Sequence, residues 1–318
     1  MIVDLLLTVS PHLFVQQFTP PVPLGLCLVA AGLVVCASFV VVGLFARSGN
    51  AYASYPRFNL STSKIGKMIP RSGLTVVAQI SSILIFFLVV FAGLIGDSNP
   101  VYNIAPTMVW VIWWVGIAYV SAFLGDVWSI LNPWKILFEC IEKMVQKLDM
   151  DLLRKPIAQY PRRFGIWPAL ILLLVFAWIE NVYSDAILPV RISQMILIYS
   201  GITWIGMFVY GKDVWIRHGE AFSLVFGFLA KFAPIATSSG RSYSARISTE
   251  RVQQDSIRYE DSSISSNEGG SYNSSDLMLR PFGSGLLNVD PGPTTQMLFI
   301  LVLLASVTFD GFTATVLW

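Results

Sequence analysis

The chain has 318 residues, of which 55% are hydrophobic and 13% are charged, and its formal net charge is +2. Because a soluble domain carries about 25% charged residues, this composition argues against a disordered chain, a disulfide scaffold and an ordinary soluble enzyme. The small net charge provides no basic field for binding nucleic acid. We predict an all-α integral membrane protein.

A spanning helix needs about 20 predominantly apolar residues, and about six stretches of the chain meet this requirement. In chain order they are Leu24–Ala46, Gly73–Gly96, Thr107–Leu124, Phe164–Tyr183, Ile192–Tyr210 and Met297–Val316. Of the 21 Lys and Arg residues, only Arg191 lies outside the three loops 47–72, 125–163 and 211–296. The positive-inside rule therefore places these loops in the cytoplasm and both termini outside.

Two segments between the spans are predicted to be helical without crossing the membrane. Residues 132–148 form an amphipathic helix on the inner membrane face, with Asn132 as the N-cap and Pro133 in the first turn. Its apolar stripe consists of Ile136, Leu137, Cys140, Ile141, Met144, Val145 and Leu148. Ala221–Ile235 is apolar but too short to span, so we interpret it as re-entrant or interfacial. If it did cross, the last helix would be inverted.

These elements divide the chain into three parts. Residues 1–236 form a five-span membrane bundle that includes the amphipathic helix 132–148. Residues 237–296 are rich in serine and form a flexible cytoplasmic linker, because they cannot bury enough apolar surface to offset the entropy of ordering. Residues 297–318 form the sixth transmembrane helix.

The tryptophans follow two patterns. Five of them stand near predicted span ends and fit an aromatic belt at the membrane interfaces, namely Trp128, Trp134, Trp167, Trp215 and Trp318. Trp110, Trp113, Trp114 and Ile117 instead share one helical face by their spacing. That face serves either packing and lipid contact or the wall of a site for an aromatic substrate, and the sequence leaves both interpretations open.

Acidic residues at membrane depth are costly and are therefore candidates for function. Asp310 lies well inside the last span, and Glu180 lies near the outer end of the fourth. Together with His12 they could bind a divalent metal ion or activate water. The alternative is that Glu180 is solvated at the headgroups and Asp310 hydrogen-bonds to a neighbouring helix. On the inner side we expect structural roles for Asp126, Asp213, His218 and Glu220.

Several segments taken in order resemble the membrane-bound fenitrothion hydrolase family. They are HLFVQQFTPPVPLGLCL from His12, SFVVVGLFAR, YPRFNL, GDVWSILNPWKILFE, FGIWPALILLLVFAWIENVY, YGKDVWIRHGEAFSLVFGFLAKFAP and TFDGF. The resemblance implies a hydrolase of the bacterial inner membrane that cleaves the P–O–aryl bond of organophosphorus triesters such as fenitrothion. For this reaction we assign Asp310 as general base or metal ligand, with Glu180 and His12 as further candidates; the resemblance itself identifies neither catalytic residues nor a metal.

Longer members of that family continue with further spans after the FDGF string. We therefore expect a second, small membrane subunit as a partner, besides the lipid bilayer and the apolar aryl phosphotriester. Two alternatives remain: a transport or channel component, and a non-catalytic scaffold of a membrane complex. Transport predicts polar residues near the middle of several spans, where this chain offers only Gln79, Ser81, Ser82 and Gln194.

Overall fold

The computed structural model describes residues 58–59, 71–148, 156–237, 277–286 and 294–313, together with five single residues of the first predicted span. This part of the chain is mostly helical. Three of its helices are long and apolar enough to cross a membrane, namely Gly73–Ile95, Ile104–Leu124 and Pro189–Tyr210. The rest of the span Leu24–Ala46, His12 and most of the Ser-rich segment lie outside the described residues.

The elements follow the predicted order. The helices are α4 (Arg71–Ile95), α5 (Ile104–Pro106), the π-helix η1 (Thr107–Gly116), α6 (Ile117–Leu124), α7 (Trp128–Leu131), α8 (Pro133–Lys147), η3 (Arg162–Phe164), α9 (Trp167–Asn181), η4 (Ser184–Ile187), α10 (Pro189–Tyr210), α11 (Lys212–His218), α12 (Ala221–Leu229), η6 (Ser284–Leu286) and α14 (Thr294–Thr313). The strands are β1 (Phe58–Asn59), β2 (Ile235–Thr237) and β3 (Leu277–Leu279).

One of the predicted spans is shorter than expected. Helix α9 has only 15 residues because Gly165, with φ of 48°, breaks the chain before Trp167 and the helix ends at Asn181. Helix α14 begins three residues before the predicted start at Met297 and is described as far as Thr313, so the predicted end at Val316 lies outside the described residues. Within the described residues, three of the six predicted spans are present as long apolar helices.

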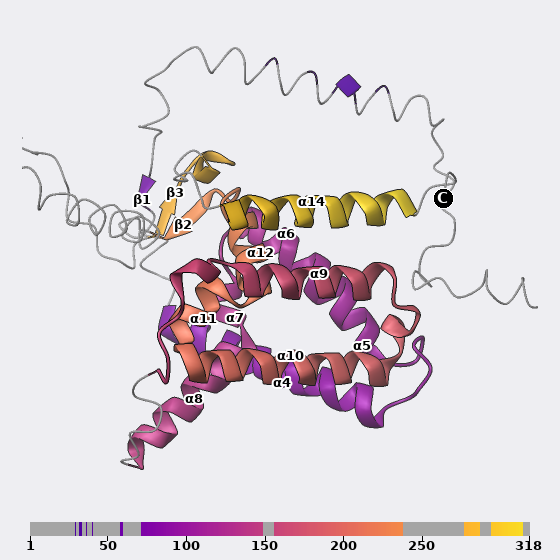
Figure 1. The fold of residues 1–318 in the computed structure, drawn as a ribbon, viewed down its shortest axis with the longest axis vertical. Helices are drawn as coiled ribbons and strands as arrows, with labels where there is room; N and C mark the ends of the chain where they lie inside the picture. The colour runs from indigo at the N-terminus through magenta and orange to yellow at the C-terminus, as the bar shows by residue number, and fades with distance from the viewer. Residues whose placement is uncertain are drawn as a thin grey trace, which may run out of the picture.

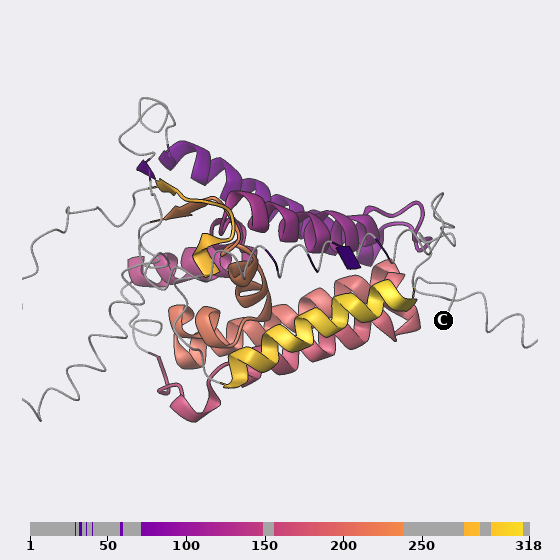
Figure 2. The ribbon, with the colours of Figure 1, turned by 90° about the horizontal axis from the view of Figure 1, so that it is seen from above.

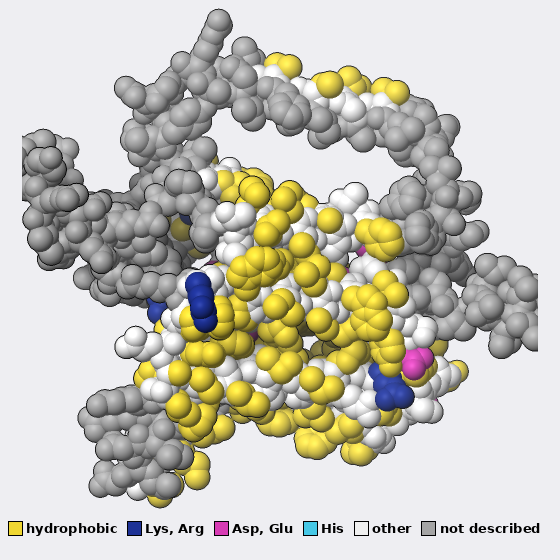
Figure 3. All heavy atoms as spheres, in the orientation of Figure 1, with side chains coloured by type: hydrophobic (Ala, Val, Ile, Leu, Met, Phe, Trp, Pro, Cys, Tyr) yellow, Lys and Arg dark blue, Asp and Glu magenta, His cyan; other side chains and the backbone are white. Residues whose placement is uncertain are grey.

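The helices form a bundle with a wide separation at its centre. Helix α10 packs on α4 and α11, while α9 packs on α14 and α12. Figures 1 and 2 show α9, α10 and α14 with their axes roughly parallel, and the C-terminal ends of α9 and α14 lie at the same end of the bundle. Hydrophobic side chains cover most of the face seen in Figure 3, as expected for helices that contact lipid.

The three short strands lie at the opposite end of the bundle. They form an antiparallel sheet in the order β1-β3-β2, in which Phe58 and Ile235 both pair with Leu279. Strand β3 falls inside the predicted flexible linker 237–296, so that prediction is wrong for this part of it. The sheet ties the chain before α4 and the chain after α12 to the same end.

Helices α11 and α12 form a short hairpin that enters and leaves the bundle at that end. Helix α11 runs back along α10, and α12 returns between α6 and α9. The backbone carbonyl of Ile235, in strand β2 after α12, lies against Gly125, which directly follows α6. The re-entrant or interfacial interpretation of residues 221–235 stays a prediction.

The amphipathic helix begins as predicted. Asn132 caps α8 by accepting a hydrogen bond from the backbone N–H of Lys135 at 3.1 Å, and Pro133 occupies the first turn. The first half of the helix is buried through Trp134, Ile136 and Phe138. The apolar stripe of its second half is exposed, including Cys140, Ile141, Met144 and Leu148. Helix α8 is therefore anchored in the bundle at one end and projects from it at the other.

The aromatic belt prediction is wrong for three tryptophans. Trp128, Trp134 and Trp215 are 2%, 5% and 7% exposed and belong to the main hydrophobic core. They come from α7, the buried first half of α8, and α11, which fold into the bundle. Trp167 is 44% exposed, so only this one of the four described belt residues lies at the surface. Trp318 lies outside the described residues.

Candidate functional site

Glu180 and Asp310 are brought together at one end of the bundle. Glu180 stands in the last turn of α9 and Asp310 near the end of α14, and these two helices pack against each other. The two carboxyl groups are close enough to interact electrostatically. Both side chains are partly buried. The sequence placed both residues in the outer half of the protein, and the fold gathers them on neighbouring helices.

The third residue that contacts this pair comes from the π-helix. The indole Nε1–H of Trp114 donates a hydrogen bond of 2.7 Å to Oε1 of Glu180. This bond fixes one carboxylate oxygen of Glu180 and leaves the second oxygen for another partner. The π-helix η1 is ten residues long, and π-helical segments, which are mostly single turns, often occur at functional sites. The wide π-helix places Trp113 and Trp114 beside different neighbours, as the cavity below shows.

Two other acidic residues of the outer half, Asp97 and Asp185, lie in turns of their own. His12 lies outside the described residues. Asp97 caps the following turn by accepting from the backbone N–H of Asn99 at 2.8 Å, and Asp185 belongs to the 3₁₀ turn η4 after α9. No group of three His, Cys, Asp or Glu side chains within the described ranges could hold a metal ion. The two carboxylates would thus be part of a metal site only if further ligands completed it.

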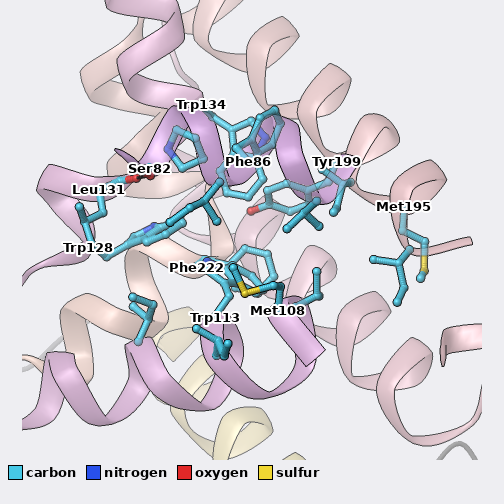
Figure 4. A pocket seen from close by; sticks show the side chains of 18 of the residues that line it. Ser82, Phe86, Met108, Trp113, Trp128, Leu131, Trp134, Met195, Tyr199 and Phe222 are labelled. Carbon is cyan, nitrogen blue, oxygen red and sulfur yellow. Dashed lines mark hydrogen bonds between the residues drawn. The ribbon is translucent and has the colours of Figure 1, made fainter. Parts of the chain in front are cut away.

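A cavity of about 610 Å³ lies in the middle of the bundle (Figure 4). Its wall is almost entirely apolar and is formed by helices α4, η1, α6, α9, α10 and α12 with the short α7 and α8. The aromatic residues in this wall are Phe86, Trp110, Trp113, Trp128, Trp134, Phe176, Tyr199 and Phe222. Such a volume and lining are typical of a site for a small apolar molecule.

The cavity bears on the two interpretations of the helical face that carries Trp110, Trp113, Trp114 and Ile117, namely packing and lipid contact or the wall of a site. Trp110, Trp113 and Ile117 line it, so this face is a wall of an interior space. Trp114 does not line it and instead reaches Glu180. The ring of Trp114 packs edge-on against Phe176, with centroids 4.7 Å apart. Since Phe176 lines the cavity, these two rings form a partition between the cavity and the carboxylate pair.

Glu220 forms a second polar cluster that the sequence did not identify as such. Its side chain is fully buried at the tip of the α11–α12 hairpin. It accepts hydrogen bonds from the backbone N–H groups of Phe222 at 3.0 Å and Ser223 at 2.7 Å, which caps α12. It also accepts from the hydroxyl of Tyr199 at 2.5 Å and from the side-chain amide of Asn132 at 3.2 Å.

This cluster ties three helices together at the rim of the cavity. Tyr199 belongs to α10, Asn132 precedes α8 and Glu220 precedes α12, so one carboxylate holds all three. Tyr199 also lines the cavity. The structural role expected for Glu220 is therefore present, in the form of an N-cap. The signal in the sequence was an acidic residue directly before an apolar helix.

The other inner-side residues act locally. Asp126 accepts a bond of 3.1 Å from the backbone N–H of Ser129 at the start of α7. Lys212 pairs with Glu139 at 3.1 Å and with Glu142 at 3.3 Å, which links α11 to α8. Burial lowers the pKa of Lys212, but hydrogen bonds to the two carboxylates and their negative charge outweigh this effect, so the pKa is raised.

Comparisons with known proteins give no assignment. No family model, curated protein or solved structure matches the chain. Membership of the fenitrothion hydrolase family therefore stays a prediction from the sequence. The geometry contributes two further observations, the pairing of Glu180 with Asp310 and the aromatic cavity beside it.

Proposed function

We propose that this chain is the larger subunit of a membrane hydrolase that cleaves the P–O–aryl bond of organophosphorus triesters such as fenitrothion. In this proposal the protein lies in the bacterial inner membrane with about six spans, its N-terminus outside and its basic loops in the cytoplasm. A second, small membrane subunit completes the active enzyme. The proposal is supported by the segments quoted above and by one structural observation, the pairing of Glu180 with Asp310.

The two carboxylates take distinct roles. Glu180 is held by Trp114, so its position is fixed, and it orients the attacking water. Asp310 acts as the general base that removes a proton from this water. If a metal ion is bound, the two carboxylates would hold it, and it would supply a lowered pKa of the bound water. The hydroxide adds to phosphorus and the aryloxide leaves with the electrons of the P–O bond. A nitroaryloxide is a stable anion, so it needs no strong general acid.

Two carboxylates alone make an incomplete metal site. Structural and catalytic zinc sites use at least three protein ligands, and Mg²⁺ accepts one or two carboxylates with water and substrate oxygens. His12 and residues of the small subunit are the proposed source of further ligands. The proposal thus expects the isolated chain to be inactive and the co-expressed pair to be active.

The test uses membranes that carry the chain together with the small membrane protein encoded beside it. Release of the nitrocresol from fenitrothion is followed by its colour, before and after treatment with a chelator. We expect Asp310→Asn and Glu180→Gln each to lower turnover by a factor of about 10² to 10⁴, as loss of a general base does. Glutamine at 180 keeps an oxygen that can accept from Trp114, so the local packing is retained.

A matched control separates chemistry from assembly. Asp213→Asn removes an exposed carboxylate at the other end of the bundle and should leave turnover unchanged. Co-purification of the small subunit measures assembly for every variant. Wild-type turnover in the Asp310→Asn complex, with assembly intact, would favour the scaffold alternative. The transport alternative receives no support from the cavity, whose lining is apolar.

A further inference from the structure

The geometry points to the central cavity as the place where the neutral aryl ester enters from the bilayer and from which the charged products are excluded. We propose this as a binding function of the cavity itself, separate from the carboxylates that carry the chemistry. The identity of the ligand rests on the proposed function. The existence of a selective cavity for neutral aromatic molecules does not, because it can be measured by binding alone.

The first step is the chemistry of the wall. Aromatic rings meet edge to face around the cavity, as between Trp113 and Phe222, whose ring centroids lie 4.5 Å apart. Further ring contacts connect Trp134 with Phe86 and with Tyr199. A planar aryl group packs well on such rings, since aromatic pairs gain about 0.5–1.5 kcal/mol beyond the area they bury. A volume of about 610 Å³ holds a ligand of the size of an aryl dialkyl ester.

The second step is that the described residues in the wall of the cavity offer no positively charged side chain to an anionic ligand. No Lys, Arg or His is among the described residues that line the cavity. Several donors in the wall are already engaged: Ser82 donates to the carbonyl of Leu131, and Tyr199 donates to Glu220. The indole N–H of Trp134 donates to Ser200 at 2.7 Å, whereas the buried indole N–H of Trp128 has no hydrogen-bond partner within the described residues. An anion would exchange its water for a neutral indole N–H with no countercharge, and that cost is large in an apolar site.

The third step is the position of the entrance. Helices α9 and α10 face each other across the cavity, and each packs on other helices. Val175 on α9 and Ile198 and Ile202 on α10 line the cavity and are also 49%, 65% and 40% exposed. Figure 3 looks onto this face, which is hollowed between the two helices and covered by hydrophobic side chains. The entrance therefore opens towards the hydrocarbon of the bilayer, where an apolar ester is concentrated.

The fourth step is the relation to the carboxylate pair. Phe176 and Ile179 line the cavity, and Glu180 follows them directly on the same helix. Trp113 lines the cavity while its neighbour Trp114 bonds to Glu180. The cavity and the carboxylates thus share one wall. Hydrolysis turns a neutral ester into two anions, so a cavity that admits only neutral molecules favours substrate over product.

The experiment measures binding and not turnover. The full chain with its small subunit is reconstituted in nanodiscs, and quenching of tryptophan fluorescence by a nitroaryl ligand reports occupancy, with empty nanodiscs as the reference for lipid partitioning. The probes are fenitrothion and its nitrocresol, the latter below and above the pKa of the phenol. Fenitrothion binding is measured on the wild type and also on the Glu180→Gln complex. The low turnover expected of this variant prevents consumption of the ester during the measurement.

Neighbouring positions on α4 provide the matched variants. Ala78 lines the cavity, whereas Val77 is 60% exposed and does not line it. We expect saturable binding of the ester and the neutral phenol, at least tenfold weaker binding of the phenolate, a loss of at least tenfold in Ala78→Phe and less than twofold in Val77→Phe. Ile196→Phe fills the cavity from α10 and repeats the test if Ala78→Phe does not fold.

The outcomes separate the two proposals. Equal affinity for phenol and phenolate, binding no greater than in empty nanodiscs, or equal effects of the cavity-filling variants and Val77→Phe would each overturn the cavity proposal. Selective binding together with no hydrolysis of fenitrothion would retain the cavity and remove the proposed reaction. Hydrolysis that persists when the cavity is filled would retain the reaction and remove the cavity from it.

Discussion

Removal of the Glu220 side chain should destabilise the protein strongly. In the Glu220→Ala variant four donors lose their acceptor: two backbone N–H groups of α12, the hydroxyl of Tyr199 and the amide of Asn132. Hydrogen bonds to a charged group contribute roughly 1.5–3 kcal/mol each, but such contributions are not additive. Breaking a buried charged cluster costs about 3–5 kcal/mol. We expect a loss of about 4 kcal/mol in the free energy of unfolding.

A milder change keeps the shape of the side chain. Glu220→Gln retains one acceptor oxygen but loses the charge that faces the N-terminus of α12, so we expect a loss of about 1–2 kcal/mol. Tyr199→Phe removes the hydroxyl that donates to Glu220 at 2.5 Å. The double variant Tyr199→Phe, Glu220→Ala should lose less than the sum of the two single losses, because both changes remove the same bond.

The assay is reversible unfolding of the purified protein in mixed micelles, followed by circular dichroism. Asp213→Ala is the control, because Asp213 is exposed on the same hairpin and its loss should cost under about 1 kcal/mol. A Glu220→Ala protein within about 1 kcal/mol of the wild type would refute the reasoning. It would mean that water or another group satisfies the four donors, and that the cluster does not hold the hairpin in place.

Three further predictions concern packing, an ion pair and topology. A Cβ at Gly93 would collide with Ser193, so Gly93→Ala should cost about 1–3 kcal/mol, whereas Gly201→Ala meets nothing within 4 Å and should be neutral or stabilising in the same unfolding assay. Lys212→Gln should lower the free energy of unfolding by roughly 1 kcal/mol at neutral pH. Because the pKa of Lys212 is raised in the folded protein, this difference from the wild type should vanish as pH rises through that pKa. A difference that stays constant with pH would contradict the prediction. In a chain without its other cysteines, exposed Cys140 should react with an impermeant maleimide from the cytoplasmic side alone, and labelling from outside would invert the proposed topology.

The local features of the fold were largely predictable from the sequence. Helix α4 begins two residues before its predicted start at Gly73 and ends one residue before its predicted end at Gly96. The cap of α8 was predictable because Asn followed by Pro is a local signal for a helix start. The length of α9 was not, since the left-handed Gly165 that precedes it has no apolarity signal.

The tertiary features could not be read from the sequence. Trp128 and Trp134 looked like interface anchors because the chain turns near them, yet the turns fold inward and bury both rings. The cavity needs residues from eight helices, and no local pattern records their meeting. Glu180 and Asp310 are 130 positions apart, and only the packing of α14 on α9 brings them into electrostatic range.

The π-helix connects the two features on which function is proposed to depend. Its consecutive residues Trp113 and Trp114 serve different neighbours: the first lines the cavity, and the second bonds to Glu180. A π-helix, with its i→i+5 hydrogen bonds, is rare compared with an α-helix. We therefore expect it to persist where surrounding packing supports it. Here that packing is aromatic on both sides, through Phe222 and Phe176. A protein that needed only a spanning helix at this position would gain nothing from this geometry. One that must separate an apolar cavity from a pair of carboxylates gains the partition that Trp114 and Phe176 provide.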